Sequence, residues 1–246
     1  MSGTPDYSCR SAFVSHRGAV RKVNEDAFLE APDLGLWVVA DGMGGHEGGQ
    51  LASWMVIDAL DRVPAPVALE PFVDEVRKKV LAVNDRLREI GERTYGGAIV
   101  GATIAVLLVF DGRGVCLWAG DSRIYLFRRN VLTRITTDHS RVQEMIASGT
   151  IDQAQAETHP LRNYLTRAVG AQEDLRLDLH AERLQDGDVF LMCSDGLTKA
   201  MTDDEIEALL RQRDGADPAQ RLLERCLARK VTDNVTIGLV QVSQSA

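Results

Sequence analysis

The chain has 246 residues, of which 45% are hydrophobic and 26% are charged, and its formal net charge is −8. A chain of this length and composition can bury a full hydrophobic core. The acidic balance and the lack of a dense Lys/Arg run argue against nucleic acid as a partner. The longest apolar stretch, "AIVGATIAVLLVF", has about 13 residues, which is too few to span a bilayer.

The N-terminal sequence and the cysteines bear on location. "MSGTPDYSCRSAF" has no basic segment followed by an apolar core, so it does not resemble a signal peptide. The four cysteines, Cys9, Cys116, Cys193 and Cys226, form no C-x-x-C pair, and the last three lie in apolar segments. We therefore expect reduced thiols, three of them buried, in a soluble, cytoplasmic protein without a membrane partner. Nothing in the sequence indicates an oligomer, so we expect a monomer.

One strand and two helices are predicted in the first part of the chain. A β-branched run predicts a strand over Leu36–Ala40. The segment Gln50–Arg62 is apolar almost all round, which predicts a well-buried helix. In Pro71–Tyr95 the apolar residues recur at every third or fourth position, which predicts an amphipathic helix with one buried face.

Three strands come next, over Ala102–Phe110, Val115–Gly120 and Arg123–Arg128. "FDGRGV" between the first two is typical of a hairpin turn, and "AGDS" forms an equally short link to the third. Tight links of this kind predict antiparallel pairing of consecutive strands. The polar, weakly periodic stretch from about Asp138 to Leu165 then predicts an excursion from the sheet core.

The C-terminal part predicts a strand, two helices and a last strand, over Asp188–Ser194, Asp203–Arg213, Pro218–Arg229 and Asn234–Val242. "TDDE", residues 202–205, supplies an N-cap and early acidic residues for the first of these helices. The sequence contains no linker, repeat or low-complexity tract. We therefore expect residues 1–246 to form a single α+β domain of layered antiparallel strands and helices.

Asp-Gly pairs recur along the chain, and those at Asp111 and Asp186 are typical of turns. Asp41 and Asp195 differ because each directly follows an apolar strand and precedes a helical segment, while Asp233 opens the last strand. Strand ends in one sheet lie about 5 Å apart, so these carboxylates would repel one another unless a cation joined them. An oxygen-only cluster of this kind suits Mg²⁺ or Mn²⁺ rather than zinc.

A further acidic pair, Glu25 and Asp26, follows Arg21 by four and five residues. By itself this pattern is typical of a solvated, charged turn.

The sequence lacks the motifs of several other classes of hydrolase. No cysteine has the arginine six positions later that a cysteine phosphatase needs, and the sequence has no Gly-Lys pair for a P-loop and no G-x-S-x-G. Clusters of His and Cys typical of zinc sites are also absent from the sequence.

Eight short segments together resemble one family. They are "RKVNEDAF", "VVADGMGGHEGG", "GATIAVLLV", "WAGDSRIYLFR", "TTDHS", "LTRAVG", "LMCSDGLTKAM" and "TDNVTIGLV". In order and spacing they are similar to the successive motifs of the type 2C, metal-dependent protein serine/threonine phosphatases (PPM), bacterial branch. The resemblance covers roughly Ser15 to Val242. It implies a four-layer α-β-β-α sandwich of two antiparallel sheets flanked by helices.

The resemblance also implies a site for two Mn²⁺ or Mg²⁺ ions at one end of the sandwich. Asp41 matches the residue that bridges both ions. Asp195 and Asp233 match further ligands of the first ion, and Glu25 and the Gly42 carbonyl match ligands of the second. A water shared by the two ions would attack the phosphate directly, without a covalent phosphoenzyme.

Other positions carry further implied roles. Asp121 matches a ligand of a third, weaker metal site that is shared with Asp195. Asp26 matches the acidic residue that hydrogen-bonds the bridging water, and Arg21 matches the arginine that binds the substrate phosphate. In some relatives a histidine after the Asp-Gly pair protonates the leaving group. Met43 stands there in this chain, so His46 is the nearest candidate for that acid. The alternatives are that His46 is a loop histidine capping the next helix and that a metal-bound water is the acid.

The segment 138–165 matches the variable flap beside the cleft, which touches substrate in the family. We expect the substrates to be phosphoserine and phosphothreonine proteins, countering a bacterial Ser/Thr kinase. The alternative is a pseudophosphatase that acts as a binding module, but the acidic set and Arg21 are present. A sigma-factor-regulating phosphatase is a third alternative, but such proteins usually carry sensor domains, for which this chain has no room.

Overall fold

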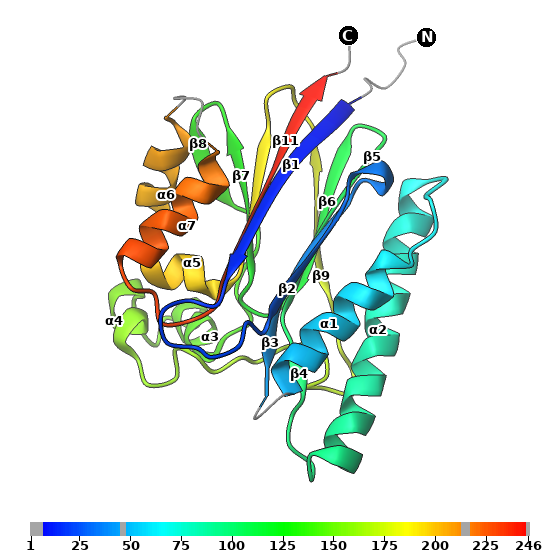
Figure 1. Cartoon of the computed structure of the whole chain (residues 1–246), viewed down its shortest axis with the longest axis vertical. Coiled ribbons are helices and arrows are strands. Elements are labelled where there is room, and N and C mark those ends of the chain that lie inside the picture. Colours follow the sequence, from blue (N-terminus) through cyan, green and yellow to red (C-terminus); the bar gives the residue numbers. More distant parts are fainter. Residues whose placement is uncertain (1–6, 45–47, 213–216, 245–246) are drawn as a thin grey trace.

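The computed structural model describes residues 7–44, 48–212 and 217–244. Two antiparallel sheets face each other, with helices on the outer side of each (Figure 1). The four-layer α-β-β-α sandwich predicted from the sequence is therefore confirmed. The first sheet has the strand order β1-β11-β10-β7-β8. Its strands are β1 (Tyr7–His16), β11 (Val235–Gln244), β10 (Val189–Cys193), β7 (Arg123–Arg128) and β8 (Val131–Arg134).

The second sheet has the order β2-β3-β5-β6-β9, and the short strand β4 pairs with β3. Its strands are β2 (Asp26–Ala31), β3 (Leu36–Met43), β5 (Ile104–Phe110), β6 (Arg113–Ala119), β9 (Asp178–Arg183) and β4 (Gly101–Ala102). A 3-10 turn, η1 (Pro32–Leu34), joins β2 to β3. As predicted, "FDGRGV" is a hairpin, in which Phe110 pairs with Arg113.

Helices α1 (Gly48–Asp61) and α2 (Leu69–Thr94) cover the second sheet. The first sheet is covered by α5 (Asp195–Ala200), α6 (Asp203–Leu210) and α7 (Pro218–Ala228). The excursion between residues 138 and 165 contains α3 (Arg141–Ala147) and α4 (Gln153–Thr158). A β-bridge between Ser140 and Leu165 holds its two ends together. The part of the chain that the structure describes has no helix both long and apolar enough to cross a membrane.

Strand β3 shows how the core is built. Its side chains alternate between two faces, as the period of two along a strand requires. Leu36, Val38 and Ala40 pack with the residues of α1 and α2 in one apolar cluster. Trp37 and Val39 pack between the two sheets in another. Because both faces are covered, the strand reads as a continuous apolar run rather than as an alternating one.

The sequence missed four strands, and all four are sheet edges: β1, β8, β2 and β9. Edge strands are partly exposed and tend to carry polar residues, which weakens the apolar signal of a strand. "DLHAER" in β9 is an example, since its residues alternate between partly buried and exposed. The strands that were predicted from apolar runs are the interior ones.

The predicted pairing across "AGDS" is wrong. Strand β6 belongs to the second sheet and β7 to the first, so this link carries the chain from one sheet to the other. Gly120 has φ +116, a conformation that favours glycine. The Ser122 hydroxyl is buried and lies 2.7 Å from the Thr103 hydroxyl, which anchors the crossing to β5. The turn therefore connects layers instead of neighbouring strands.

Helix α1 is less buried than its composition suggested. Ala52, Val56 and Leu60 are buried, but Trp54 is 62% exposed and Leu51 is 38% exposed. The helix packs on the sheet and on α2 through one face only, so the prediction of a well-buried helix holds for that face alone.

Two other predictions are confirmed. All four cysteines are free, with Cys116, Cys193 and Cys226 buried, and Thr202 caps α6 by accepting a hydrogen bond from the Glu205 N–H.

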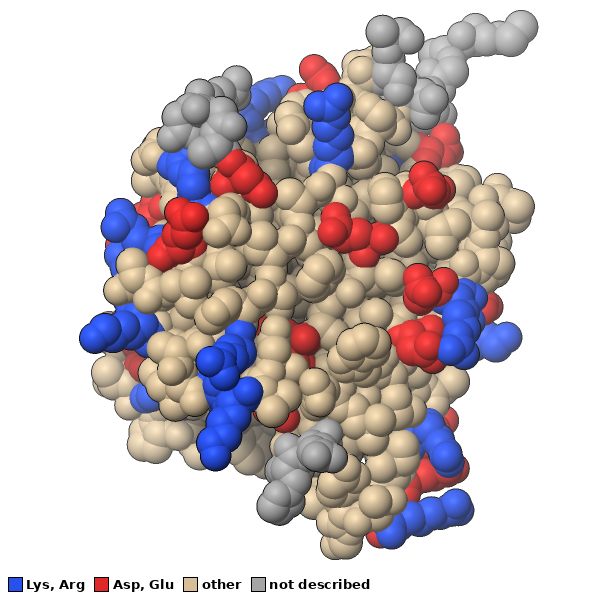
Figure 2. Space-filling view, in the orientation of Figure 1, with Lys and Arg blue, Asp and Glu red and all other residues tan. Residues whose placement is uncertain are grey.

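The N-terminal end of β1 and the C-terminal end of β11 lie together at one end of the sandwich, and the C-terminal ends of β3 and β6 lie at the other (Figure 1). On the face shown in Figure 2, acidic and basic side chains are interspersed, and Lys and Arg form no continuous patch.

We predict that Gly120→Ala destabilises the fold. An added Cβ would lie 2.5 Å from the Thr103 Cβ, in a backbone conformation that L residues rarely adopt. The clash and the strain together should lower the free energy of unfolding by about 3–5 kcal/mol, measured by urea unfolding. Gly149→Ala is the control, since Gly149 has φ +71 but no atom within 4 Å of the added Cβ. It should cost only about 1–2 kcal/mol, and equal losses would contradict the explanation.

Candidate active site

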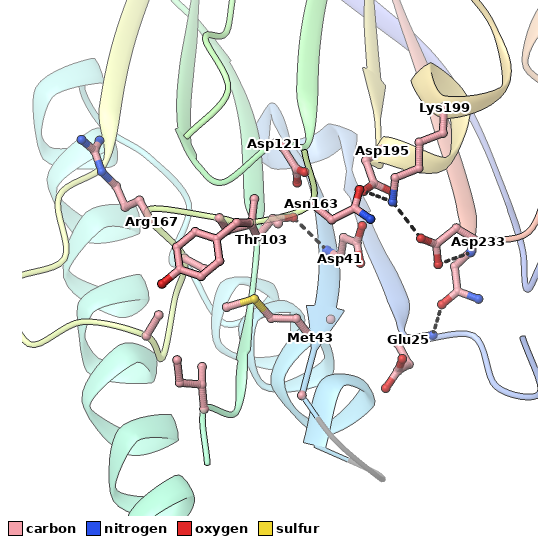
Figure 3. A pocket seen from close by; sticks show the side chains of 18 of the residues that line it. Glu25, Asp41, Met43, Thr103, Asp121, Asn163, Arg167, Asp195, Lys199 and Asp233 are labelled. Atoms are coloured by element: carbon pink, nitrogen blue, oxygen red, sulfur yellow. Dashed lines mark hydrogen bonds and ion pairs between the residues drawn. The ribbon is translucent and has the colours of Figure 1, made fainter. Parts of the chain in front are cut away.

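A cavity of about 500 Å³ lies at the loop end of the sandwich (Figure 3). Its wall is formed by residues of both sheets and of the segments that connect their strands. The acidic residues that line it are Glu25, Asp41, Asp121, Asp195 and Asp233. Arg21 and Gly42 line the same cavity. Of the remaining predicted site residues, Asp26 lies buried behind this wall, and His46 lies outside the described residues.

Asp41 does not follow its strand, as the sequence suggested, but belongs to it. Strand β3 continues to Met43, and Asp41 lies directly opposite Asp26 of β2 in the antiparallel register. The Asp41 N–H donates to the Thr103 hydroxyl over 3.2 Å, and the Thr103 N–H donates to the Asp41 carbonyl over 2.8 Å. Burial, reinforced by the neighbouring carboxylates, raises the pKa of Asp41 well above its ordinary value.

Asp26 is a buried carboxyl with one engaged oxygen. Its side chain is held by Ser194, whose hydroxyl donates to Oδ2 over 2.7 Å, and by Thr236, whose hydroxyl donates over 2.8 Å. Oδ1 has no hydrogen-bond partner among the described residues. Burial raises the pKa of Asp26 to about 7, against the opposing effect of the two hydroxyl donors. This carboxyl is therefore able to exchange a proton near neutral pH.

Asp195 lies two residues after β10, and Asp121 lies two residues after β6. Asp195 is the first residue of α5, and its Oδ1 is buried without a hydrogen-bond partner in the described part of the chain. Burial raises the pKa of Asp195. Burial and the adjacent Asp195 also raise the pKa of Asp121, to about 8. Asp121 makes no ion pair within the described residues, and Asp195 keeps one buried oxygen without a partner.

Two cationic side chains form ion pairs with Asp233, which lies just before β11. The Lys199 ammonium contacts Asp195 Oδ2 and lies 2.9 Å from Asp233 Oδ2 (Figure 3). The Arg21 guanidinium lies 2.9 Å from the other Asp233 oxygen, Oδ1. Burial acts to raise the pKa of Asp233, but Lys199 and Arg21 outweigh it and hold that pKa below its ordinary value. Asp233 is thus ionised and paired on both oxygens.

Asn234 positions the segment that carries Arg21 and Glu25. Its side-chain amide donates to the backbone carbonyls of Arg17 and Val23, each over 3.0 Å. Its side-chain oxygen accepts a hydrogen bond from the Glu25 N–H over 2.9 Å. The sequence analysis missed this residue and also Lys199. The available signals were the polar residue beside Asp233 in "TDNV" and the i,i+4 spacing of Asp195 and Lys199.

Gly42 permits a close approach of three backbone segments. A Cβ at this position would lie 2.1 Å from the Gly49 carbonyl oxygen and 2.7 Å from that of Glu25. The Gly42 N–H donates to the same Glu25 carbonyl over 3.1 Å. Glycine is therefore needed here so that β3, the start of α1 and the Glu25 loop can meet beside Asp41.

The opposite wall of the cavity comes from other segments, including Ile99, Tyr164 and Arg167. The Arg167 side chain extends away from the acidic residues (Figure 3) and pairs with Asp178. Met43 projects into the cavity near Asp41 (Figure 3), and its thioether has no proton to donate. This wall is less charged than the side that carries Asp195 and Asp233.

Comparison with known proteins identifies the family. A family model described as Protein phosphatase 2C matches residues 15–234. The serine/threonine phosphatase stp of Listeria welshimeri is 32% identical over 237 residues, which cover 93% of this chain and 94% of that protein. PppA of Pseudomonas aeruginosa is a similar solved structure, with a TM-score of 0.87 and 42% identity over 96% of this chain and 100% of that one.

A second similar solved structure contains metal ions. The catalytic domain of the serine threonine protein phosphatase PstP, in complex with two manganese ions, has a TM-score of 0.85. It is 32% identical and covers 97% of this chain and 100% of that chain. The chain belongs to the protein phosphatase 2C family. Phosphatases of this family depend on metal ions.

The acidic side of the cavity suits the divalent cations of a type 2C phosphatase. Its donors are all oxygens, which hard cations such as Mn²⁺ and Mg²⁺ prefer. The unpartnered Asp195 Oδ1 and the raised pKa values of Asp41 and Asp121 show that positive charge is lacking there. Within the described residues, no three Asp, Glu, His or Cys side chains already form a closed ligand set, and Lys199 joins Asp195 to Asp233 instead.

We predict that Mn²⁺ binding releases protons and strengthens as the pH rises from about 6 to about 8. Burial gives Asp26 a pKa of about 7 and Asp121 a pKa of about 8, so near neutral pH part of the protein carries these protons. Cations require the ionised carboxylates, so each coupled proton makes the affinity rise by up to about tenfold per pH unit. Calorimetric titration in two buffers of different ionisation enthalpy measures the release. An affinity that does not change with pH would contradict the raised pKa values.

Proposed function

We propose that this chain hydrolyses phosphoserine and phosphothreonine in proteins, the reaction of serine/threonine phosphatases of its family, in the acidic cavity at the loop end of the sandwich. The observation that carries the proposal is the convergence of five carboxylates, from loops of both sheets, in one cavity together with Arg21. Nothing in the site favours a pseudophosphatase, because the acidic residues and the arginine that such a protein would lose are all in place.

The proposed metal ligands divide into two sets. Asp195 and Asp233 would hold one Mn²⁺ or Mg²⁺ ion, Glu25 and the Gly42 carbonyl would hold the other, and Asp41 would contact both. When bound, two such ions would offset the charge of the phosphate and activate a water for attack. Asp121 together with Asp195 would provide a third, weaker site. The carboxylates reach these positions from rigid strand ends, which supports a defined spacing between the ions.

Arg21 is the proposed phosphate ligand. Its side chain is 50% exposed at the edge of the cavity, next to Asp233. A planar guanidinium can donate two parallel hydrogen bonds to a phosphate. The Asn234 contacts with the backbone of residues 17 and 23 fix the loop on which Arg21 stands. Arg21 would therefore orient the phosphate relative to the carboxylates.

Asp26 is proposed to orient the attacking water. Ser194 and Thr236 occupy Oδ2, which leaves Oδ1 free to accept a hydrogen bond from water. With a pKa of about 7, raised by burial, the same oxygen can take up a proton during the reaction. Asp26 and Asp41 are cross-strand neighbours of β2 and β3, which supports a role for Asp26 beside the proposed metal ligands.

The acid that protonates the leaving serine or threonine oxygen is proposed to be His46. Met43 occupies the position next to the Asp-Gly pair and cannot donate a proton. His46 follows it by three residues in the sequence, between the last residue of β3 and the first of α1. An alcohol is a poorer leaving group than a phenol, so phosphoserine needs this proton more than phosphotyrosine does.

The excursion at residues 138–165 is proposed to act as the flap of the single catalytic domain. Asn163, Tyr164 and Leu165, at its C-terminal end, line the cavity. Tyr164 is 62% exposed, so it is available to contact a phosphoprotein. We further propose that the substrates are products of a bacterial Ser/Thr kinase and that the phosphatase acts in the cytoplasm as a monomer.

The activity is tested by Mn²⁺-dependent release of phosphate from a phosphothreonine peptide. The wild-type protein should turn over with Mn²⁺ or Mg²⁺ and should lose activity in EDTA. Asp41→Asn should lower kcat by at least about 100-fold, since it removes the carboxylate shared by the two ions. Asp111→Asn is a matched control in an Asp-Gly pair of a hairpin turn and should stay fully active. Absence of turnover with either metal would refute the proposed activity.

The role of Arg21 is tested by Arg21→Ala. We expect KM for the phosphopeptide to rise by about tenfold or more and kcat to fall less, because phosphate binding is partly the same in the ground state and the transition state. Arg21→Lys keeps the charge but not the planar fork, so its KM should lie between those of the wild type and the alanine variant. An unchanged KM in Arg21→Ala would show that other groups bind the phosphate.

A further inference from the structure

Lys199 lies where the proposed first metal ion would bind. Its ammonium contacts Asp195 Oδ2 and lies 2.9 Å from Asp233 Oδ2 (Figure 3). Lys199 stands four residues after Asp195, so the two side chains share one face of α5. Two carboxylates from separate segments of the chain, at the start of α5 and just before β11, are thereby joined by one protein cation.

The fold keeps this lysine in place. Leu197 and Met201, on either side of Lys199, are buried in the apolar cluster beneath α5. The Met201 N–H donates to the Leu197 carbonyl over 2.9 Å, and the Ser194 N–H donates to the Thr236 carbonyl over 3.0 Å. The backbone of α5 is thus fixed at both ends. Only the flexible side chain of Lys199, which is 37% exposed, is free to leave the carboxylates.

The distribution of charge explains why the ammonium stays there. Burial opposes a charged ammonium, but Asp195 and Asp233 more than compensate, and the pKa of Lys199 is raised above its ordinary value. Within the described residues that line the cavity, Arg167 pairs with Asp178 instead, which leaves Lys199 and Arg21 as the cations that contact the acidic side. Lys199 therefore supplies a large part of the positive charge that holds these carboxylates together.

The Lys199 ammonium lies between Oδ2 of Asp195 and Oδ2 of Asp233, where one cation can contact both carboxylates. A divalent cation held by the same two carboxylates would repel the ammonium at close range. A cation bound between Asp195 and Asp233 would therefore weaken or displace the Lys199 contacts. Charge-assisted contacts of this kind are stronger than neutral hydrogen bonds, although partial exposure reduces their contribution. The lost contacts oppose metal binding and favour the metal-free protein.

We propose that Lys199 is an internal competitor for the metal: it occupies the Asp195–Asp233 pair in the metal-free protein, stabilises that form and weakens its affinity for divalent cations. The inference rests on the proposed function in one respect, the assignment of Asp195 and Asp233 as metal ligands. It concerns the balance between metal-free and metal-bound protein and goes beyond the reaction itself. The competing explanation is an ordinary surface ion pair, which would leave metal affinity unchanged.

The test compares Lys199→Met with the wild type in the full chain, using Mn²⁺ alone as the probe. Calorimetric titration should give a Kd for Mn²⁺ about tenfold lower in Lys199→Met, which corresponds to about 1.4 kcal/mol. Thermal unfolding in EDTA should give a Tm lower by about 2–4 °C, because the metal-free carboxylates lose their counter-ion. Tighter metal binding combined with a less stable metal-free fold distinguishes competition from a purely structural role.

Two control variants separate local from general charge effects. Lys78→Met removes the same charge from an exposed position in α2, and both its Kd and its Tm should match the wild type. Lys199→Arg keeps a cation on α5 and should bind Mn²⁺ as weakly as the wild type. If Lys199→Met does not fold, Lys199→Gln, which is polar and neutral, should show the same lower Kd.

The outcomes also separate this inference from the proposed function. Equal Kd values for Mn²⁺ in the wild type, Lys199→Met and Lys78→Met would overturn the competition while leaving the metal site intact. A similar decrease of Kd in Lys199→Met and Lys78→Met would also overturn it, since long-range charge would then be the cause. Failure of the wild type to bind Mn²⁺ would overturn the proposed metal site together with the inference.

Discussion

The structure depends on holding several carboxylates together where water is scarce. Five acidic side chains line one cavity, and a sixth, Asp26, lies behind it, directly opposite Asp41 in the β2–β3 register. Like charges facing each other across a strand pair are destabilising, and burial adds to the cost. The residues cannot move apart, since they are attached to two sheets that are locked together by a shared core containing Trp37 and Phe190. The stability of the sandwich thus opposes the repulsion inside its own cavity.

The interior of the fold could be predicted from the sequence, whereas its borders could not. Strands such as β5 and β10 are buried on both faces, and continuous apolar runs indicate them directly. The edge strands β1, β2, β8 and β9 carry mixed polar sequences because one edge of each is free of sheet partners. The prediction of antiparallel pairing across "AGDS" failed for a different reason, because loop length alone does not distinguish a hairpin from a connection between the two sheets. That distinction depends on the φ of Gly120 and on the contact between Ser122 and Thr103.

For the site, the sequence indicated which acidic residues matter but not how they are neutralised. Asp41, Asp195 and Asp233 are recognisable because each interrupts or borders an apolar run, and all three line the cavity. Asn234 contacts Val23, 211 residues away, and Lys199 contacts Asp233, 34 residues away. The local i,i+4 spacing of Asp195 and Lys199 does not reveal either of these long-range contacts. Asp26 looked like part of a solvated turn, yet it is 6% exposed and bound by Ser194 and Thr236. Burial, which decides its chemistry, exists only in the folded chain.

The cavity neutralises its charge in two different ways. On the side of Asp233 the protein uses its own cations, since Lys199 and Arg21 pair with both carboxylate oxygens and lower the pKa of that group. On the side of Asp41 and Asp121 no ion pair is found within the described part of the chain, burial raises the pKa values, and protons supply the compensation. A pair of divalent cations would have to displace protons on one side and an ammonium on the other. The two halves of the site should therefore respond differently to pH and to substitution, even though Asp41 would join them.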